Sequence, residues 1–84
     1  MRNYYVVLME VTNDKEVTCA WQDWGGSSRK SDAIKEAKQL LKEIKEGKWD
    51  RRLSDKERAE GFYLNACVEV VNDDGDLLEI LEVA

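Results

Sequence analysis

Residues 31–46, SDAIKEAKQLLKEIKE, decide the fold because their apolar side chains recur with the spacing of an amphipathic helix. Ser31 is a suitable N-cap, with Ser27 or Ser28 as alternatives one turn earlier. Gly47 stands where a left-handed residue commonly ends a helix. At about 100° per residue, the apolar side chains occupy roughly a third of the helix circumference. They are Ala33, Ile34, Ala37, Leu40, Leu41 and Ile44. We therefore predict one long helix whose apolar stripe packs on another element.

Four other segments have the character of β-strands. Residues 3–12 contain a continuous run of aromatic and β-branched side chains, which is typical of an interior strand. Residues 16–24 and 62–71 alternate apolar with polar side chains, as half-buried strands do. Residues 76–83 are apolar on both faces, and the NDDG sequence just before them predicts a hairpin turn.

The order of these elements predicts a single α+β domain over residues 1–84, with one antiparallel sheet of about four strands in ββαββ order. The long helix packs on one face, and the capping-box spacing of Ser54 and Glu57 predicts a short helical turn after it. That layout leaves apolar side chains of the first and last strands without a cover. We expect the second face of the sheet, or an edge strand, to contact another protein or a second copy of this chain.

Composition excludes several classes of protein. The chain has no histidine, which removes the common Ser-His and Cys-His nucleophile pairs and every histidine metal site. No apolar run approaches the roughly 18 residues of a membrane span. The N-terminus has one basic residue, Arg2, but no cleavage-site pattern follows Val11, so we expect no signal peptide and a cytoplasmic protein. Cys19 and Cys67 are expected to be small buried side chains, and whether they are neighbours is left open.

Two motifs suggest a ligand but lack its requirements. Gly25 and Gly26 precede a helix, yet they are adjacent and lack the Lys-Ser/Thr ending of a phosphate-binding loop, so a flexible turn is favoured. The acidic residues 72–76 lack the spacing and the final glutamate of an EF-hand, so a hairpin tip is favoured. The sequence therefore predicts no metal, no cofactor and no enzymatic activity.

The uneven charge favours a protein-binding role. The net charge of −5 divides into −2 for residues 1–27, +3 for residues 28–61 and −6 for residues 62–84. An acidic hairpin suits a partner with a basic surface, such as a nucleic-acid channel where carboxylates replace phosphates. The plainer alternative is an edge that keeps the protein soluble. The predicted partner-binding residues are Asp23, Trp24, Asp73, Asp74, Asp76, Glu79 and Glu82.

Two further hypotheses concern function. Small acidic domains without site chemistry are, as a class, often inhibitors that occupy a partner's surface, and phage-encoded inhibitors of host defence nucleases are one example. This analogy rests on size and charge, since no motif carries it. The alternative is a nucleic-acid-binding protein, although the acidic final third opposes it. Its contact residues would be Lys35, Lys38, Lys42, Lys45, Arg51 and Arg52.

Overall fold

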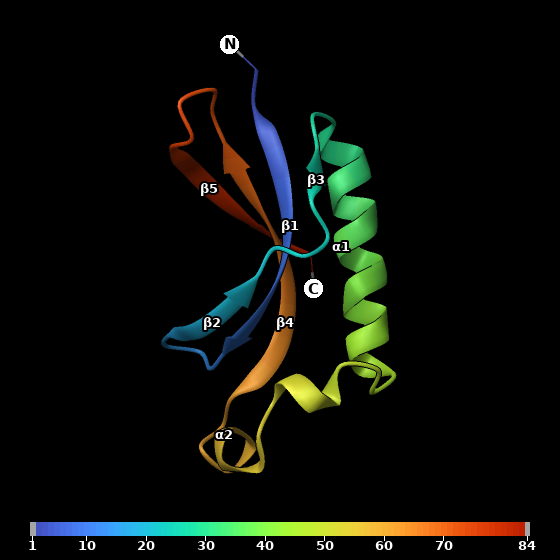
Figure 1. The fold of residues 1–84 in the computed structure, drawn as a ribbon, viewed down its shortest axis with the longest axis vertical. Helices are drawn as coiled ribbons and strands as arrows, with labels where there is room; N and C mark the ends of the chain where they lie inside the picture. The colour runs from blue at the N-terminus through green and yellow to red at the C-terminus, as the bar shows by residue number, and fades with distance from the viewer. Residues whose placement is uncertain (1, 84) are drawn as a thin grey trace.

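The computed structural model describes residues 2–83 as an antiparallel sheet with one long helix on one of its faces (Figure 1). The strands are β1 (Tyr4–Thr12), β2 (Val17–Trp21), β3 (Gly26–Ser27), β4 (Tyr63–Val71) and β5 (Leu77–Glu82). The helices are α1 (Lys30–Lys45), the 3₁₀ turn η1 (Asp50–Arg52) and α2 (Asp55–Ala59). The predicted α+β class is confirmed, with β3 as an additional short strand.

β1 and β4 form the centre of the sheet and pair along their whole length, from Tyr4 opposite Val71 to Thr12 opposite Tyr63. β2 and β3 share the other edge of β1, and β5 pairs with β4, so the order is β2-β1-β4-β5. Because side chains alternate along a strand and cross-strand partners share a face, this register assigns each residue to a face. We name the face covered by α1 the helix face and the opposite one the open face.

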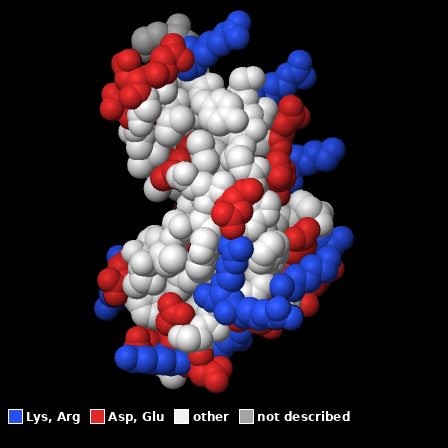
Figure 2. Space-filling view, in the orientation of Figure 1, with Lys and Arg blue, Asp and Glu red and all other residues white. Residues whose placement is uncertain are grey.

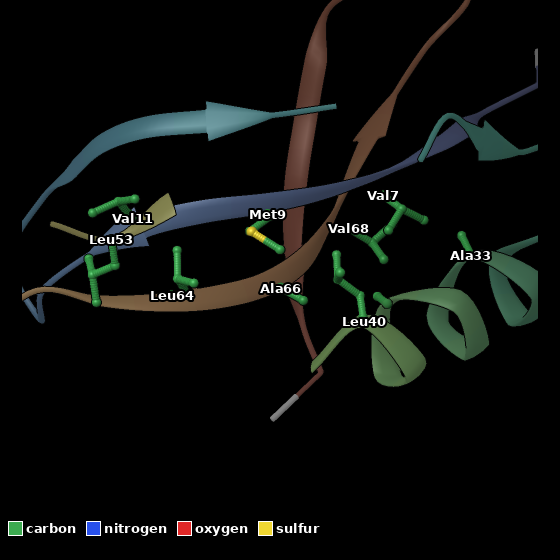
Figure 3. Packing of buried hydrophobic residues seen from close by; sticks show 10 residues of the cluster. Val7, Met9, Val11, Ala33, Leu40, Leu53, Leu64, Ala66 and Val68 are labelled. Carbon is green, nitrogen blue, oxygen red and sulfur yellow. The ribbon is translucent and has the colours of Figure 1, made fainter. Parts of the chain in front are cut away.

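The hydrophobic core lies between the helix face and α1 (Figure 3). The buried residues of α1 are Ala33, Ala37 and Leu40, which confirms the centre of the predicted stripe. Ile34, Leu41 and Ile44 are half-buried at the margins of the contact. The sheet contributes a buried set from β1 and β4, closed at one end by Leu53: Val7, Met9, Val11, Leu64, Ala66 and Val68.

The start of α1 differs from the prediction, because Ser31 is not its cap. The helix begins at Lys30, and Arg29 occupies the N-cap position without a side-chain capping bond. The Ser27 hydroxyl instead accepts a hydrogen bond from the Arg29 amide at 3.0 Å, because β3 fixes the chain immediately before the helix. The helix ends as predicted, with Gly47 at a φ of +83°.

The glycine pair before α1 forms strand β3, which the sequence pattern did not predict. Gly26 lies opposite Val6 of β1. A Cβ atom at Gly26 would collide with the carbonyl oxygen of Tyr5. Glycine is therefore required here for the close approach of two backbones, and the predicted flexible turn is wrong for Gly26.

β2 is more exposed than its alternating pattern predicts. The register shifts between Val11 and Thr12, so Val17 lies opposite Thr12 on the open face and is 53% exposed. Cys19 is also exposed, which corrects the expectation that both cysteines are buried. Cys67 is buried on β4, and β1 separates it from β2, so both thiols are free.

Both predicted turn motifs are present. Ser54 caps α2 by accepting a hydrogen bond from the Glu57 amide, and the Glu57 carboxylate accepts one from the Ser54 amide. The β4–β5 hairpin turns at Gly75, whose φ is +83°. The Asn72 side chain stabilises that turn by accepting hydrogen bonds from two backbone amides of the tip. Residues 72–76 therefore form the predicted hairpin tip.

Candidate partner-binding surface

The open face carries an apolar patch that no other part of residues 2–83 covers, since α1 lies against the opposite face (Figure 1). The register places Tyr4, Val71 and Leu77 in one row across β1, β4 and β5. The next row contains Ile80, opposite Glu69 of β4. Tyr4, Leu77 and Ile80 are 45%, 53% and 50% exposed. These side chains are large, apolar and contiguous, which is typical of a contact surface.

A β-bulge adjoins this patch. Leu77 lies opposite Val71 and Glu79 lies opposite Val70, so Leu78 is an extra residue in β5. Leu78 is 52% exposed. A bulge bends its strand and increases the local twist, which displaces the start of β5 from a flat sheet. We name Tyr4, Leu77, Leu78 and Ile80 the apolar patch.

Beside the patch, the open face forms an acidic cleft of about 470 Å³ between the β1–β2 hairpin and the end of β5. The Asn65 side-chain amide lies in this cleft and donates to Glu10 Oε1 and Glu82 Oε2, each at 3.2 Å. Glu10 is only 8% exposed. The acidic side chains that line the cleft are Glu10, Asp14, Glu16 and Glu82, with Lys15 as the one basic residue among its lining.

The pKa values of two side chains, Cys67 and Tyr63, are raised in part by the negative charge of this face. Burial raises the pKa of the Cys67 thiol to about 12, and the charges of Glu10, Glu82 and Glu69 add to the rise. The pKa of Tyr63 is also raised, first by the hydrogen bond that its hydroxyl donates to Asp14 and then by burial and nearby carboxylates. Cys67 resists ionisation chiefly because burial disfavours a charged thiolate, and Tyr63 chiefly because its hydroxyl donates a hydrogen bond to Asp14; nearby negative charges add to both effects.

The carboxylates of the open face have polar partners but form no ion pair among residues 2–83, although Lys15 lines the cleft. Glu69 accepts a hydrogen bond from the Gln22 side-chain amide at 3.0 Å. Glu10 and Glu82 share the amide of Asn65. The ion pairs found in this part of the chain lie elsewhere and join Lys48 to Glu46, Arg52 to Asp23 and Arg58 to Asp50. Negative charge on the open face therefore remains available to an external cation.

The structure separates the predicted acidic residues into three places. Asp73, Asp74 and Asp76 are exposed at the hairpin tip, and acidic side chains gather over the β4–β5 hairpin at the upper left of Figure 2. Glu82 lies on the open face in the acidic cleft. Glu79 lies opposite Val70 and is exposed at the margin of the helix face. Only Glu82 is therefore brought together with Glu10, which the sequence did not indicate as a binding residue.

Asp23 and Trp24 belong to a different cluster, in which the three tryptophans of the chain surround Arg52. The Arg52 guanidinium carbon lies 4.8 Å from the ring centre of Trp21, 5.5 Å from that of Trp24 and 5.0 Å from that of Trp49. Its Nη2 atom contacts Asp23 Oδ2 at 3.0 Å. Trp24 is half-buried against the core. Trp24, which was predicted to anchor a protein partner, thus packs on Arg52, which was predicted to contact nucleic acid.

The remaining residues of the nucleic-acid hypothesis are exposed. Lys35, Lys38, Lys42 and Lys45 lie on the outer side of α1, and Arg51 is exposed next to the tryptophan cluster. Figure 2 shows basic side chains along α1 and over the lower part of the molecule, with acidic ones among them. The outer side of α1 also carries Asp32 and Glu36.

Sequence reasoning missed Glu10, Asn65, Tyr63 and Glu69 as members of the candidate surface. The sequence did contain one signal for this surface, because Glu10 places a carboxylate within the apolar run of β1. Its neighbours come from a strand more than fifty positions away, and only the β1–β4 register places them beside it.

Comparisons with protein-family models, curated proteins and solved structures find no match. Within residues 2–83, neither α-helix has the length and apolar character needed to cross a membrane. The acidic and cysteine side chains of the same residues form no group of three or more that is arranged to hold a metal ion.

Proposed function

We propose that this protein is a non-catalytic binding module whose open face docks on a cationic, partly apolar surface of another protein. The observation that carries the proposal is the contiguity of the exposed apolar patch with carboxylates that have no cationic partner among residues 2–83. Apolar contact would supply affinity, and the carboxylates would select a basic partner and speed its approach. By occupying the partner's basic surface, the protein would act as an inhibitor or regulator of that partner. The small size and the acidic charge of the chain are in keeping with this role.

The test compares affinity capture from the native host with wild-type protein, the Ile80→Ser variant and the Glu82→Lys variant. The matched control is Glu36→Lys, which makes the same change of charge on the outer side of α1. We expect wild type and the control to retain the same basic protein and the open-face variants to lose it. The proposal would be wrong if the open-face variants retained that partner while the control lost it.

Nucleic-acid binding is the second candidate, supported by the four exposed lysines of α1. A phosphate backbone needs several such contacts, and acidic side chains beside them weaken the attraction. Fluorescence anisotropy with labelled single- and double-stranded DNA distinguishes the two candidates. If the lysines bind phosphate, the joint Lys38→Gln and Lys42→Gln variant loses DNA affinity, whereas Ile80→Ser leaves it unchanged.

A further inference from the structure

We infer that the partner contributes an extended, basic segment that pairs with the outer edge of β5 and adds a strand to the sheet. The inference rests on the proposed function, because it specifies how the partner binds to that surface. Its basis is an open strand edge with anionic side chains on both faces and an adjoining apolar patch. The occupant is thus a cationic strand of another protein.

The outer edge of β5 is unpaired. β5 bonds to β4 on one side, and no strand of residues 2–83 lies on the other. In an antiparallel strand, alternate residues direct their N–H and C=O groups away from the paired neighbour. Among the residues that the structure describes, the backbone hydrogen bonds outside the sheet ladders include none to Leu77–Glu82. These outward groups are free to form a new ladder.

β5 has only part of the protection that edge strands commonly carry, namely its two glutamates and a bulge. It contains no lysine, arginine or proline. Its bulge affects only the start of the strand, at Leu77 and Leu78. All of its residues are exposed except Leu81, which is half-buried. Its two glutamates disfavour an incoming strand of negative charge and leave the edge open to one of positive charge.

Charge determines which strand is accepted. Glu79 and Glu82 lie on opposite faces of β5, and no basic residue occurs between residues 62 and 84. A second copy of this chain that paired through its own β5 would bring the same carboxylates and be repelled. β2 presents the other open edge, but the strand itself carries no charge that would select a partner. The complementary occupant of β5 is therefore cationic.

The register predicts the pattern of the occupant. Residues opposite Glu79 and Glu82 would be basic, and the two between them, opposite Ile80 and Leu81, would be apolar. The order basic-apolar-apolar-basic reads the same in both directions, so it applies to a parallel or an antiparallel strand. On the open face, the basic residue opposite Glu82 would lie at the acidic cleft.

The probe is an end-blocked peptide in which two arginines flank a pair of valines, with threonines on either side. Addition to ¹⁵N-labelled protein should shift the amide signals of β5 and slow the hydrogen exchange of alternate amides there. Methylation of one alternate set of peptide nitrogens should abolish binding, and methylation of the other set should preserve it. A peptide of the same composition with arginine and valine alternating should bind more weakly.

The protein variant for this test carries Glu79→Lys and Glu82→Lys, with Glu36→Lys and Glu60→Lys as its charge-matched control. The first should lose peptide affinity by on the order of tenfold and gain affinity for a glutamate-flanked peptide, because cross-strand charge pairs change sign. The control should change little. Circular dichroism checks that both variants remain folded.

The outcomes separate this inference from the proposed function. If both methylated peptides bind the open face equally well, strand addition is wrong and side-chain recognition remains. Signals that shift along β2 in place of β5 would also overturn the inference. If the parent peptide shifts no signal of the open face, both strand addition and the proposed cationic preference are wrong.

Discussion

At the scale of single residues, Arg52 shows where sequence reasoning stops. Its type and its basic neighbours favoured a nucleic-acid contact, whereas three tryptophan rings and Asp23 surround it in the structure. These tryptophans come from the end of β2, the loop after it and the segment after α1. Nothing in the local sequence pattern predicts that they converge. The sequence showed the chemical type of this side chain but did not show which residues it contacts.

Replacing Arg52 should therefore affect folding. A guanidinium within about 6 Å of aromatic rings gains attraction, so we expect Arg52→Gln to lower the free energy of unfolding by about 1–2 kcal/mol. Arg51→Gln is the matched control, because Arg51 is next to Arg52 in the sequence and is exposed. This substitution should change the free energy of unfolding by less than about 0.5 kcal/mol. Urea denaturation followed by tryptophan fluorescence measures both. Equal effects of the two substitutions would contradict the cation–π arrangement.

The two thiols should differ in reactivity. Cys19 is exposed, whereas burial and three carboxylates raise the pKa of Cys67 from 9.0 to about 12. Thiolate is the reactive form, so iodoacetamide should modify Cys19 at mildly alkaline pH and spare Cys67 in the folded protein. Mass spectrometry of the Cys19→Ser and Cys67→Ala variants identifies the site. Rapid modification of the folded Cys19→Ser variant would show that Cys67 is accessible.

The raised pKa of Cys67 also makes the stability of the protein depend on pH. Because the folded pKa of Cys67 lies above the unfolded value, its contribution is complete below about pH 9 and is lost as pH rises towards 12. Cys67→Ala should remove that part of the alkaline loss of stability. Denaturant midpoints of the two proteins at increasing pH provide the measurement, and identical pH profiles would contradict the assignment.

At the scale of elements, periodicity predicted most of what the structure contains. The i, i+3, i+4 spacing placed α1 correctly to within a residue, and the capping box and the β4–β5 turn occur where their motifs stand. β3 was missed because two residues give no period, and Gly26 reads as a loop until Tyr5 is placed beside it. Register was the missing information, since it depends on residues distant in sequence.

The packing of α1 gives a prediction with an internal control. Leu40 is 2% exposed in the core, whereas the adjacent Leu41 is only half-buried. Leu40→Ala should lower the free energy of unfolding by about 2–5 kcal/mol, because it leaves a cavity in a closed site. Leu41→Ala should cost less, since solvent and neighbours can fill its position. A greater loss from Leu41→Ala in chemical denaturation would mean that the helix is rotated relative to this structure.

At the scale of the whole molecule, the surfaces differ in charge. Basic side chains lie along α1 and the segment after it, and acidic ones predominate on the β4–β5 hairpin (Figure 2). The sequence predicted this division and an uncovered sheet face. It did not predict which carboxylates share that face, because Glu10, Glu69 and Glu82 meet only through the register of three strands. The candidate site was thus predictable as a region and not as a set of contacts.

The division between tip and open face predicts two different kinetic effects on partner binding. Asp73 and Asp74 are exposed, and the tip is held by hydrogen bonds that two backbone amides donate to the Asn72 side chain. Reversal of the two aspartates to lysine should therefore leave stability nearly unchanged. Charges outside the contact act mainly on the approach of the partner. The Asp73→Lys, Asp74→Lys variant should therefore slow association at low salt, and the difference from wild type should shrink as salt rises.

Ile80→Ser should act in the opposite way, by speeding dissociation with little change in association, because it removes apolar contact and no charge. Surface plasmon resonance of the captured partner at several salt concentrations measures both rates. The charge-matched Glu36→Lys, Glu60→Lys variant tests whether position matters beyond net charge. If it slows association as much as the tip variant, net charge alone attracts the partner, and the hairpin tip has no specific part in recognition.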